Sequence, residues 1–221
     1  MRLLVATTNP DKLREIRGVL TGGSFGPALR TDGLPTVKLL SLTDLPPVPE
    51  PEETGATFEA NAEIKALYYD ALARRSGVSG SAATDLTVAE DSGLEIDALG
   101  GDPGVLSARF VSPDASYAER FAEIYRRLNH MQAPRPWTAR FVCAISVVAD
   151  GTPVFQTRGT VEGRIAEAPA GGAGFGYDPI FFYPDFGCTL AEVSAERKLM
   201  VAHRGHAFRA LDRWLSEHHP Y

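Results

Sequence analysis

The sequence predicts an α/β protein with a mixed sheet, because apolar runs of strand length alternate with stretches of helical periodicity along the chain. Two long β-type runs that meet at Asp150-Gly151 predict a hairpin late in the sequence, and a hairpin adds antiparallel pairing to the sheet. A chain of 221 residues fits one domain, or one domain with two lobes, so we expect residues 1–221 to form a single domain.

The first half of the chain predicts strands separated by two helices. The first helix begins at Asn9-Pro10, with Asn9 as the N-cap and proline at the first helical position, and it ends at Gly22-Gly23. The second helix runs from about Thr57 to Gly77. Strands are expected at residues 3–6, 37–42 and 86–89, with 94–96 as a further short strand, and loops at residues 46–51 and 79–83.

The second half predicts a helix, the hairpin and a helical C-terminal region. Ser112-Pro113-Asp114 introduces the helix, and its inward residues are expected to be Tyr117, Phe121, Ile124 and Leu128. The hairpin strands are expected at residues 139–148 and 154–161, a short strand at 180–183, and a helix N-cap at Ser194.

The composition excludes several classes of protein. A hydrophobic share of 44% is typical of a globular protein, and a net charge of -6 argues against non-specific nucleic-acid binding while allowing a small anionic ligand. Cys143 and Cys188 are too few for a disulfide framework or a cysteine metal cluster, and the apolar run around Cys143 favours a buried thiol. Apolar runs are too short for a signal peptide or a membrane span, so we expect a cytoplasmic protein without membrane contact.

The first polar group that indicates chemistry is Thr7-Thr8-Asn9, with Lys12 one turn further on. It lies between a strand end and a helix start, where free backbone N–H groups and the helix dipole favour an anion. Taken alone, the segment is more typical of an ordinary capped helix with a solvated lysine.

Two acidic segments could together hold a divalent cation. Glu52-Glu53 precedes a helix that presents Asn61 and Lys65, four residues apart, on one face. Glu90-Asp91-Ser92-Gly93 follows an apolar strand, and sites form at strand ends in α/β sheets. Adjacent acids that leave a core strand must be paired, solvated or metal-bound, and magnesium prefers a few carboxylate oxygens plus substrate phosphates. Each segment alone is also compatible with a solvated loop or an acidic turn.

The late part of the chain combines an aromatic ring with cations. Gly174 and Gly176 flank Phe175 and leave its ring uncrowded, which suits stacking on a flat base; the alternative is a glycine loop with a core aromatic residue. Lys198 and His203-Arg204 follow, and these cations could complement a helix dipole or complete a phosphate or base pocket.

These blocks, in this order, resemble the inosine triphosphate pyrophosphatase family over nearly the whole chain. The matching motifs are Thr-x-Asn-x-x-Lys at 7–12, Glu-Thr-Gly-x-Thr-Phe at 53–58, acidic-Asp-Ser-Gly-Leu at 90–94, Pro-Gly-x-x-Ser-Ala-Arg at 103–109, Phe-Gly-Tyr-Asp-Pro at 175–179 and His-Arg at 203–204. Each motif is weak alone, but the ordered set is specific. The chain departs from the family pattern at Ala60, Glu90 and Val201-Ala202, none of which removes a residue assigned to chemistry.

The resemblance implies a mixed sheet in two lobes with flanking helices, a nucleotide cleft between the lobes and a homodimer. It also implies Mg²⁺-dependent hydrolysis of ITP, dITP and XTP, which are purine nucleoside triphosphates, to the monophosphate and pyrophosphate. Asp91 is implied as the catalytic base and a metal ligand, with Glu53 as the second metal ligand. Triphosphate contacts are implied for Thr7, Thr8, Asn9, Lys12, Ser92 and Lys198, and base contacts for Phe175, Gly176, Tyr177, Asp178, His203 and Arg204.

A 6-keto purine offers an acceptor at O6 and a donor at N1, and adenine offers the reverse. A donor from His203 or Arg204 beside an acceptor from Asp178 would therefore select the keto base.

Two alternative functions stay open. A related pyrophosphatase for modified pyrimidine or methylated nucleotides fits the Phe-Gly-Tyr-Asp and His-Arg motifs less well. A nucleotide-binding regulator without turnover would be expected to lack Asp91 or Glu53.

Overall fold

The computed structural model describes residues 2–20, 38–45, 47, 49–76 and 85–218. Its strands form one sheet in the order β2-β1-β3-β4-β5-β6-β7. The strands are β1 (Arg2–Val5), β2 (Lys38–Ser41), β3 (Asp85–Ile96), β4 (Thr138–Ala149), β5 (Thr152–Ile165), β6 (Phe181–Tyr183) and β7 (Cys188–Thr189). Because β1 pairs in parallel with β2 and β3 while β6 is antiparallel to β5 and β7, the predicted mixed α/β sheet is confirmed.

Helices flank these strands. The α-helices are α1 (Pro10–Leu20), α2 (Phe58–Arg75), α3 (Tyr117–His130), α4 (Ala195–Val201) and α5 (His203–His218). Short 3₁₀ turns cover Leu42–Asp44, Asp97–Leu99, Gly104–Leu106, Asp178–Ile180, Pro184–Phe186 and Leu190–Glu192. None of the helices in the described ranges is both long and apolar enough to span a membrane.

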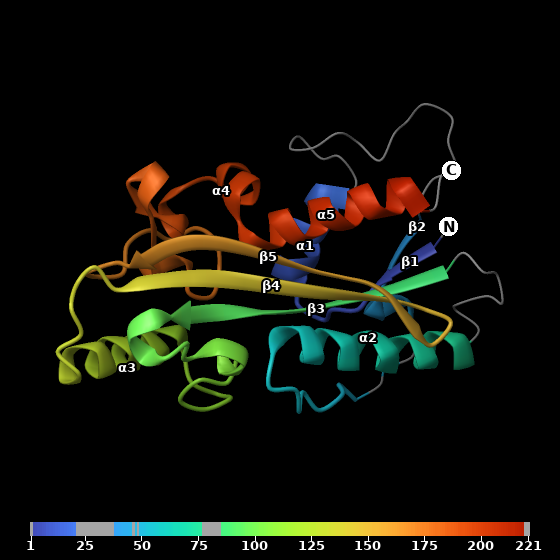
Figure 1. The fold of residues 1–221 in the computed structure, drawn as a ribbon, viewed down its shortest axis with the longest axis horizontal. Helices are drawn as coiled ribbons and strands as arrows, with labels where there is room; N and C mark the ends of the chain where they lie inside the picture. Colours follow the sequence, from blue (N-terminus) through green and yellow to red (C-terminus); the bar gives the residue numbers. More distant parts are fainter. Residues whose placement is uncertain (1, 21–37, 46, 48, 77–84, 219–221) are drawn as a thin grey trace. The chain divides into compact units, whose positions relative to one another are not determined.

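The chain divides into two compact units. Unit 1 comprises Met1–Asp91, Cys143–Gly159 and Arg204–Tyr221, and unit 2 comprises Ser92–Val142 and Thr160–His203. In unit 1, α2 covers one side of the strands, and α1 and α5 lie on the other (Figure 1). Alanines of α2 pack with apolar residues of the parallel strands; this core contains Leu4, Ala6, Leu40, Ala66, Tyr69, Ala73, Ala89 and Val148.

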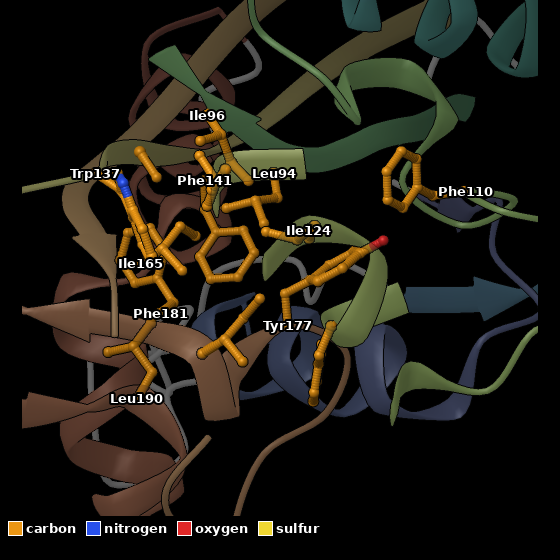
Figure 2. Packing of buried hydrophobic residues seen from close by; sticks show 14 of the residues in the cluster. Leu94, Ile96, Phe110, Ile124, Trp137, Phe141, Ile165, Tyr177, Phe181 and Leu190 are labelled. Atoms are coloured by element: carbon orange, nitrogen blue, oxygen red, sulfur yellow. The ribbon is translucent and has the colours of Figure 1, made fainter. Parts of the chain in front are cut away.

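Unit 2 has its own apolar core around the opposite end of β4. Aromatic and aliphatic side chains converge there, as Figure 2 shows for Leu94, Ile96, Phe110, Ile124, Trp137, Phe141, Ile165, Tyr177, Phe181 and Leu190. The helix α3 begins at a capping box, in which Ser116 accepts from the backbone N–H of Glu119 and the Glu119 carboxylate accepts from that of Ser116. Phe121, Ile124 and Leu128 of α3 face this core as predicted. The prediction for Tyr117 was wrong, since 39% of this residue is exposed.

Most predicted element boundaries are confirmed. Asn9 and Ser194 cap helices through their side chains, and the turn between β4 and β5 has the predicted Asp150-Gly151 with positive φ at both residues, 48° and 76°. The predicted stop at Gly22-Gly23, the closing Gly77 and the 79–83 loop lie outside the described residues.

The prediction for residues 86–96 was wrong in one respect. We expected a strand, an acidic turn and a second short strand, but β3 is one continuous strand of 12 residues that includes Glu90 and Asp91. The strand continues because both carboxylates find partners above and below the sheet, so the chain does not have to turn towards water to solvate them.

Candidate active site

Glu90 and Asp91 point to opposite faces of the sheet, because side chains alternate along a strand. Glu90 contacts Lys12 of α1 and Arg204 of α5, whereas Asp91 contacts Asn61 and Lys65 of α2. The two neighbouring acids therefore belong to two separate groups of charges within unit 1. Neither acid lies at a strand end, where we had expected both.

The Asp91 group brings together the two predicted metal ligands. Lys65 Nζ lies 2.6 Å from Glu53 Oε1 and 3.3 Å from Asp91 Oδ1, so one ammonium bridges both carboxylates. Asn61 Nδ2 donates to the other oxygen of Asp91 at 3.1 Å. Asn61 and Lys65 are one turn apart on α2, and Thr57 caps that helix by accepting from the N–H of Ala60.

Burial shifts the ionisation of this group. The pKa of Asp91 is raised, first because the carboxylate is desolvated and further by the nearby charge of Glu53, while Lys65 and Asn61 oppose the shift. Burial works against the charged form of Lys65 as well, but Asp91 and Glu53 together raise the pKa of this ammonium above its ordinary value. A partly desolvated carboxylate with a raised pKa is typical of a functional site.

Glu53 and Asp91 fit a magnesium site by the chemistry of their donors. Two carboxylates already converge on one cationic group, and Mg²⁺ is commonly held by one or two carboxylates with water and substrate phosphates as the other ligands. Within the described ranges there is no group of three or more His, Cys, Asp or Glu side chains that could hold a metal alone. Substrate phosphates or water would therefore have to complete the coordination.

The Glu90 group is an almost fully buried ion cluster. Arg204 donates to both Glu90 oxygens, at 2.8 and 3.1 Å, Lys12 Nζ lies 2.9 Å from Oε1, and the Cys143 thiol donates to Oε2 at 3.0 Å. Burial alone would raise the pKa of Glu90, but the charges of Arg204 and Lys12 hold it well below its ordinary value. The predicted buried thiol at Cys143 is confirmed.

Arg204 differs from what we expected of a residue that reads the edge of a base. Its guanidinium contacts Glu90 and, through Nη1 at 2.5 Å, Glu15, and only 1% of the residue is exposed. These contacts favour a role in the ion cluster, because the guanidinium would have to give up its contacts with Glu90 and Glu15 to reach a base.

The strand-to-helix segment before α1 also differs from the expectation. Asn9 Oδ1 accepts from the N–H of Asp11 at 2.9 Å and of Lys12 at 3.1 Å, and the Asn9 carbonyl accepts from the N–H of Leu13. We had expected free backbone donors here, but the cap occupies those of the first turn. Thr8 donates to Glu50 at 2.7 Å, so the polar side chains of this segment are already tied to neighbouring loops.

In unit 2, Phe175, Asp178 and Lys198 form a second compact group. Asp178 Oδ2 accepts from the N–H of Phe175 at 2.8 Å and from Lys198 Nζ at 2.6 Å, and Lys198 lies 4.5 Å from the centre of the Phe175 ring. Asp178 and Lys198 are buried, whereas Phe175 is partly exposed. Gly174 has φ +72°, and a side chain there would collide with the Asp178 carboxylate, so this close turn requires glycine.

Lys198, which we had assigned to the triphosphate, thus contacts two of the predicted base-binding residues. Tyr177 differs as well: its ring is part of the unit 2 core (Figure 2), and its hydroxyl donates to the Ser107 carbonyl at 2.9 Å. We had placed Tyr177 at the base edge. His203 stacks on Phe141 with ring centres 4.9 Å apart.

The remaining predicted residues lie beside these groups. Ser92 follows Asp91 in β3 and is partly buried, Gly176 follows Phe175 with φ +68°, and the Thr7 hydroxyl accepts from the N–H of Asn9. Sequence reasoning did not place Asn61 and Lys65 in the site, although their four-residue spacing was a visible signal. Ser107 is part of the 103–109 motif but was given no role, and Glu15 was missed because the sequence gives no comparable signal for it.

A mixed α/β sheet with two carboxylates on a shared lysine suits a metal-dependent reaction on a phosphorylated substrate. The model of the Ham1 family matches residues 3–214. A dITP/XTP pyrophosphatase of an Exiguobacterium species is 41% identical over 212 residues, which cover 96% of this chain and 95% of that protein.

Solved structures agree. The HAM1 protein of Coxiella burnetii is similar with a TM-score of 0.80 and 34% identity, covering 98% of this chain and 99% of that one. A nucleoside-triphosphatase, named dITP/XTP pyrophosphatase, of Mycobacterium abscessus has a TM-score of 0.66 and 40% identity, covering 96% and 97%. The chain belongs to the Ham1 family, and the resemblance inferred from its motifs is confirmed.

Proposed function

We propose that this protein hydrolyses non-standard purine nucleoside triphosphates, such as ITP, dITP and XTP, to the monophosphate and pyrophosphate. The observation that carries the proposal is the convergence of Glu53 and Asp91 on Lys65. Such a reaction needs carboxylates that can hold a metal ion beside the phosphates of the substrate. Relatives with the name dITP/XTP pyrophosphatase are similar over nearly the whole chain, which supports the same substrate class.

In this proposal Asp91 accepts the proton of the attacking water. Its contacts with Asn61 and Lys65 hold the buried carboxylate in a fixed place, and Glu53 and Asp91 would hold Mg²⁺. The metal, when bound, supplies positive charge to the phosphate oxygens. Lys12 provides a further cation near the helix start at Asn9, and Thr7, Thr8 and Ser92 provide hydroxyl groups.

The base would contact the Phe175 group. Phe175 is partly exposed with Lys198 beside its ring, so one face can stack on a purine, and Gly176 keeps the approach open. We assign Asp178, Lys198 and His203 to the edge of the base, where a keto oxygen and an N1 donor distinguish the substrate from adenine. We further propose that both units act on one nucleotide as a single domain, in a cytoplasmic homodimer.

The direct test is pyrophosphate release from a panel of purine and pyrimidine triphosphates, with Mg²⁺ and after chelation. We expect ITP, dITP and XTP to be cleaved far faster than ATP or GTP, with monophosphate as the nucleotide product. Nucleoside diphosphate as the product would place the protein in another reaction class.

Asp91→Asn tests the chemistry at nearly constant shape. It should reduce kcat by several orders of magnitude while the protein stays folded and binds ITP, because the amide cannot accept the proton. Wild-type turnover in the purified, metal-loaded variant would rule out Asp91 as base and as essential ligand.

A further inference from the structure

Asn61 is the most deeply buried polar residue beside the proposed metal ligands, with 0% of its surface exposed. Its carboxamide makes two hydrogen bonds that link different segments. Oδ1 accepts from the N–H of Gly55 at 2.7 Å, and Nδ2 donates to Asp91 Oδ2 at 3.1 Å. One side chain thus connects the loop that carries Glu53 with the strand that carries Asp91.

The orientation of this carboxamide is fixed by its neighbours. The Gly55 N–H is a donor and requires an acceptor, so the amide oxygen faces Gly55 and the NH₂ group faces Asp91. The backbone at Gly55 also lies close to the start of α2. A Cβ on residue 55 would lie 2.6 Å from Asn61 Oδ1 and 2.9 Å from Asn61 N, so only glycine permits this approach.

We propose that Asn61 is a positioning residue that sets the spacing between Glu53 and Asp91 by tying the 53–55 loop to β3. This inference rests on the proposed function. Glu53 precedes Gly55 by two residues, so a loop held at Gly55 places Glu53 against Lys65 and beside Asp91. Lys65 also bridges the two carboxylates, but it does so through a long and flexible side chain.

Three variants separate the two halves of the carboxamide. Asn61→Ala removes both hydrogen bonds. Asn61→Asp keeps an acceptor for the Gly55 N–H but replaces the donor to Asp91 with a second carboxylate. Gly55→Ala retains the Asn61 carboxamide but places a Cβ against Asn61 Oδ1, so it pushes the 53–55 loop away from α2. Glu63→Gln is the matched control, because Glu63 lies on the same helix and contacts Gln156 instead of the site.

We expect kcat for ITP to fall by about 100-fold or more in all three variants, because displacements of about 1 Å at a reacting centre have that effect. KM should change by less than threefold, since the Asn61 carboxamide is occupied by Gly55 and Asp91 and has no proposed contact with the substrate. Exchange of the Gly55 amide, followed by NMR, should become at least tenfold faster in Asn61→Ala and remain slow in Asn61→Asp. Glu63→Gln should match the wild-type protein in every measurement.

A kcat that stays within threefold of wild type in folded Asn61→Asp and Gly55→Ala would overturn the inference. So would a lowered Tm with unchanged kcat, which is the result for a merely structural residue. If Asn61→Ala does not fold, the other two variants carry the test. Pyrophosphate release from ITP by the wild-type protein distinguishes the two proposals: its absence refutes the proposed function, whereas its presence together with fully active Asn61 variants refutes only the positioning role.

Discussion

Glu90 and Asp91 are adjacent acids of the same strand, yet burial affects their ionisation differently. Desolvation would raise the pKa of both, but Arg204 and Lys12 reverse the shift at Glu90, whereas at Asp91 the charge of Glu53 adds to it. Glu90 therefore stays charged as part of a structural cluster, and Asp91 is the better proton acceptor. This contrast is consistent with the structural role of Glu90 and with the proposed catalytic role of Asp91.

Replacing Glu90 should test its structural role. Glu90→Gln leaves Arg204 and Lys12 without their shared carboxylate, so we expect a loss of about 3–5 kcal/mol in the free energy of unfolding at pH 7. Glu123→Gln is the control, because Glu123 pairs with Arg126 and Arg127 at the surface, where an ion pair contributes only about 0–1 kcal/mol. Urea unfolding of both variants gives the comparison, and equal losses would contradict the assignment.

The same residue predicts a dependence on pH. The folded pKa of Glu90 lies well below its ordinary value of 4.5, so its stabilisation is fully present above pH 4.5 and is lost as the pH falls through the folded pKa. Wild-type stability should therefore decrease on acidification in this window more steeply than that of Glu90→Gln. Parallel curves of unfolding free energy against pH would show that Glu90 is not responsible.

Phe175 offers a test of base binding with a close internal control. Stacking contributes about 1–3 kcal/mol per base, so Phe175→Ala should lower kcat/KM about 5- to 150-fold for every purine triphosphate. Phe186 is also a partly exposed ring under a cation, with Arg197 4.1 Å from its centre, but it lies outside the proposed site. Phe186→Ala should leave kcat/KM unchanged, and equal effects of the two variants would mean that Phe175 is only a packing residue.

At the scale of elements, α2 carries the site because of its composition. Its buried face is built from alanines at 62, 66 and 73, which allow the helix to pack closely on the strands, and the same side of its first turns presents Asn61 and Lys65. The N-cap at Thr57 fixes where this helix begins. The residue at which α2 begins thus determines where along β3 the Asn61 amide and the Lys65 ammonium group contact Asp91.

Thr57→Ala should cost about 1 kcal/mol of unfolding free energy, because the N–H of Ala60 loses its side-chain acceptor. Thr57→Ser retains a hydroxyl and should restore most of that stability. Urea denaturation of the two variants measures the difference. If serine is no better than alanine, the cap does not contribute as described.

Local sequence signals predicted helix caps and turns well, but they did not predict which distant residues form ion pairs. Asn9, Ser194 and the Asp150-Gly151 turn act on their immediate neighbours, so their roles could be predicted. The continuity of β3 through Glu90 and Asp91 depends on cations 78 residues before and 114 residues after Glu90, which no local pattern contains. The contact of Arg204 with Glu90 could not be predicted for the same reason, since a pair of basic residues looks alike whether it faces a ligand or a buried carboxylate.

At the scale of the whole molecule, three strands belong to both compact units. The unit boundaries fall within β3, β4 and β5, and the change from unit 1 to unit 2 occurs between Asp91 and Ser92. The proposed phosphate and base groups belong to different units, so substrate binding should stabilise both at once. Ligand binding to the folded state raises stability by RT ln(1 + [L]/Kd).

Thermal unfolding of the inactive Asp91→Asn protein should report this coupling. ITP at about 100 times its Kd should add about 2.7 kcal/mol and raise Tm in a single transition, whereas ATP at the same concentration should have a smaller effect. Two separate transitions, with ITP shifting only one, would contradict common binding by both units. The Phe175→Ala change introduced into the same protein should reduce the shift caused by ITP.

The uninterrupted β3 strand also limits which insertions and deletions the gene can tolerate. Side chains alternate between the two faces of a sheet along a strand. Deleting one residue between the start of β3 and Glu90 would therefore turn each later side chain to the other face. Glu90 would then face α2, and the shorter Asp91 side chain would face the cations of α1 and α5 in place of Glu90. Deleting two residues restores the facing but moves both acids along the strand by about 6.6 Å. Deletions of one residue and of two residues should therefore both be selected against in this segment. Single substitutions that keep the alternation of buried and exposed side chains should be tolerated.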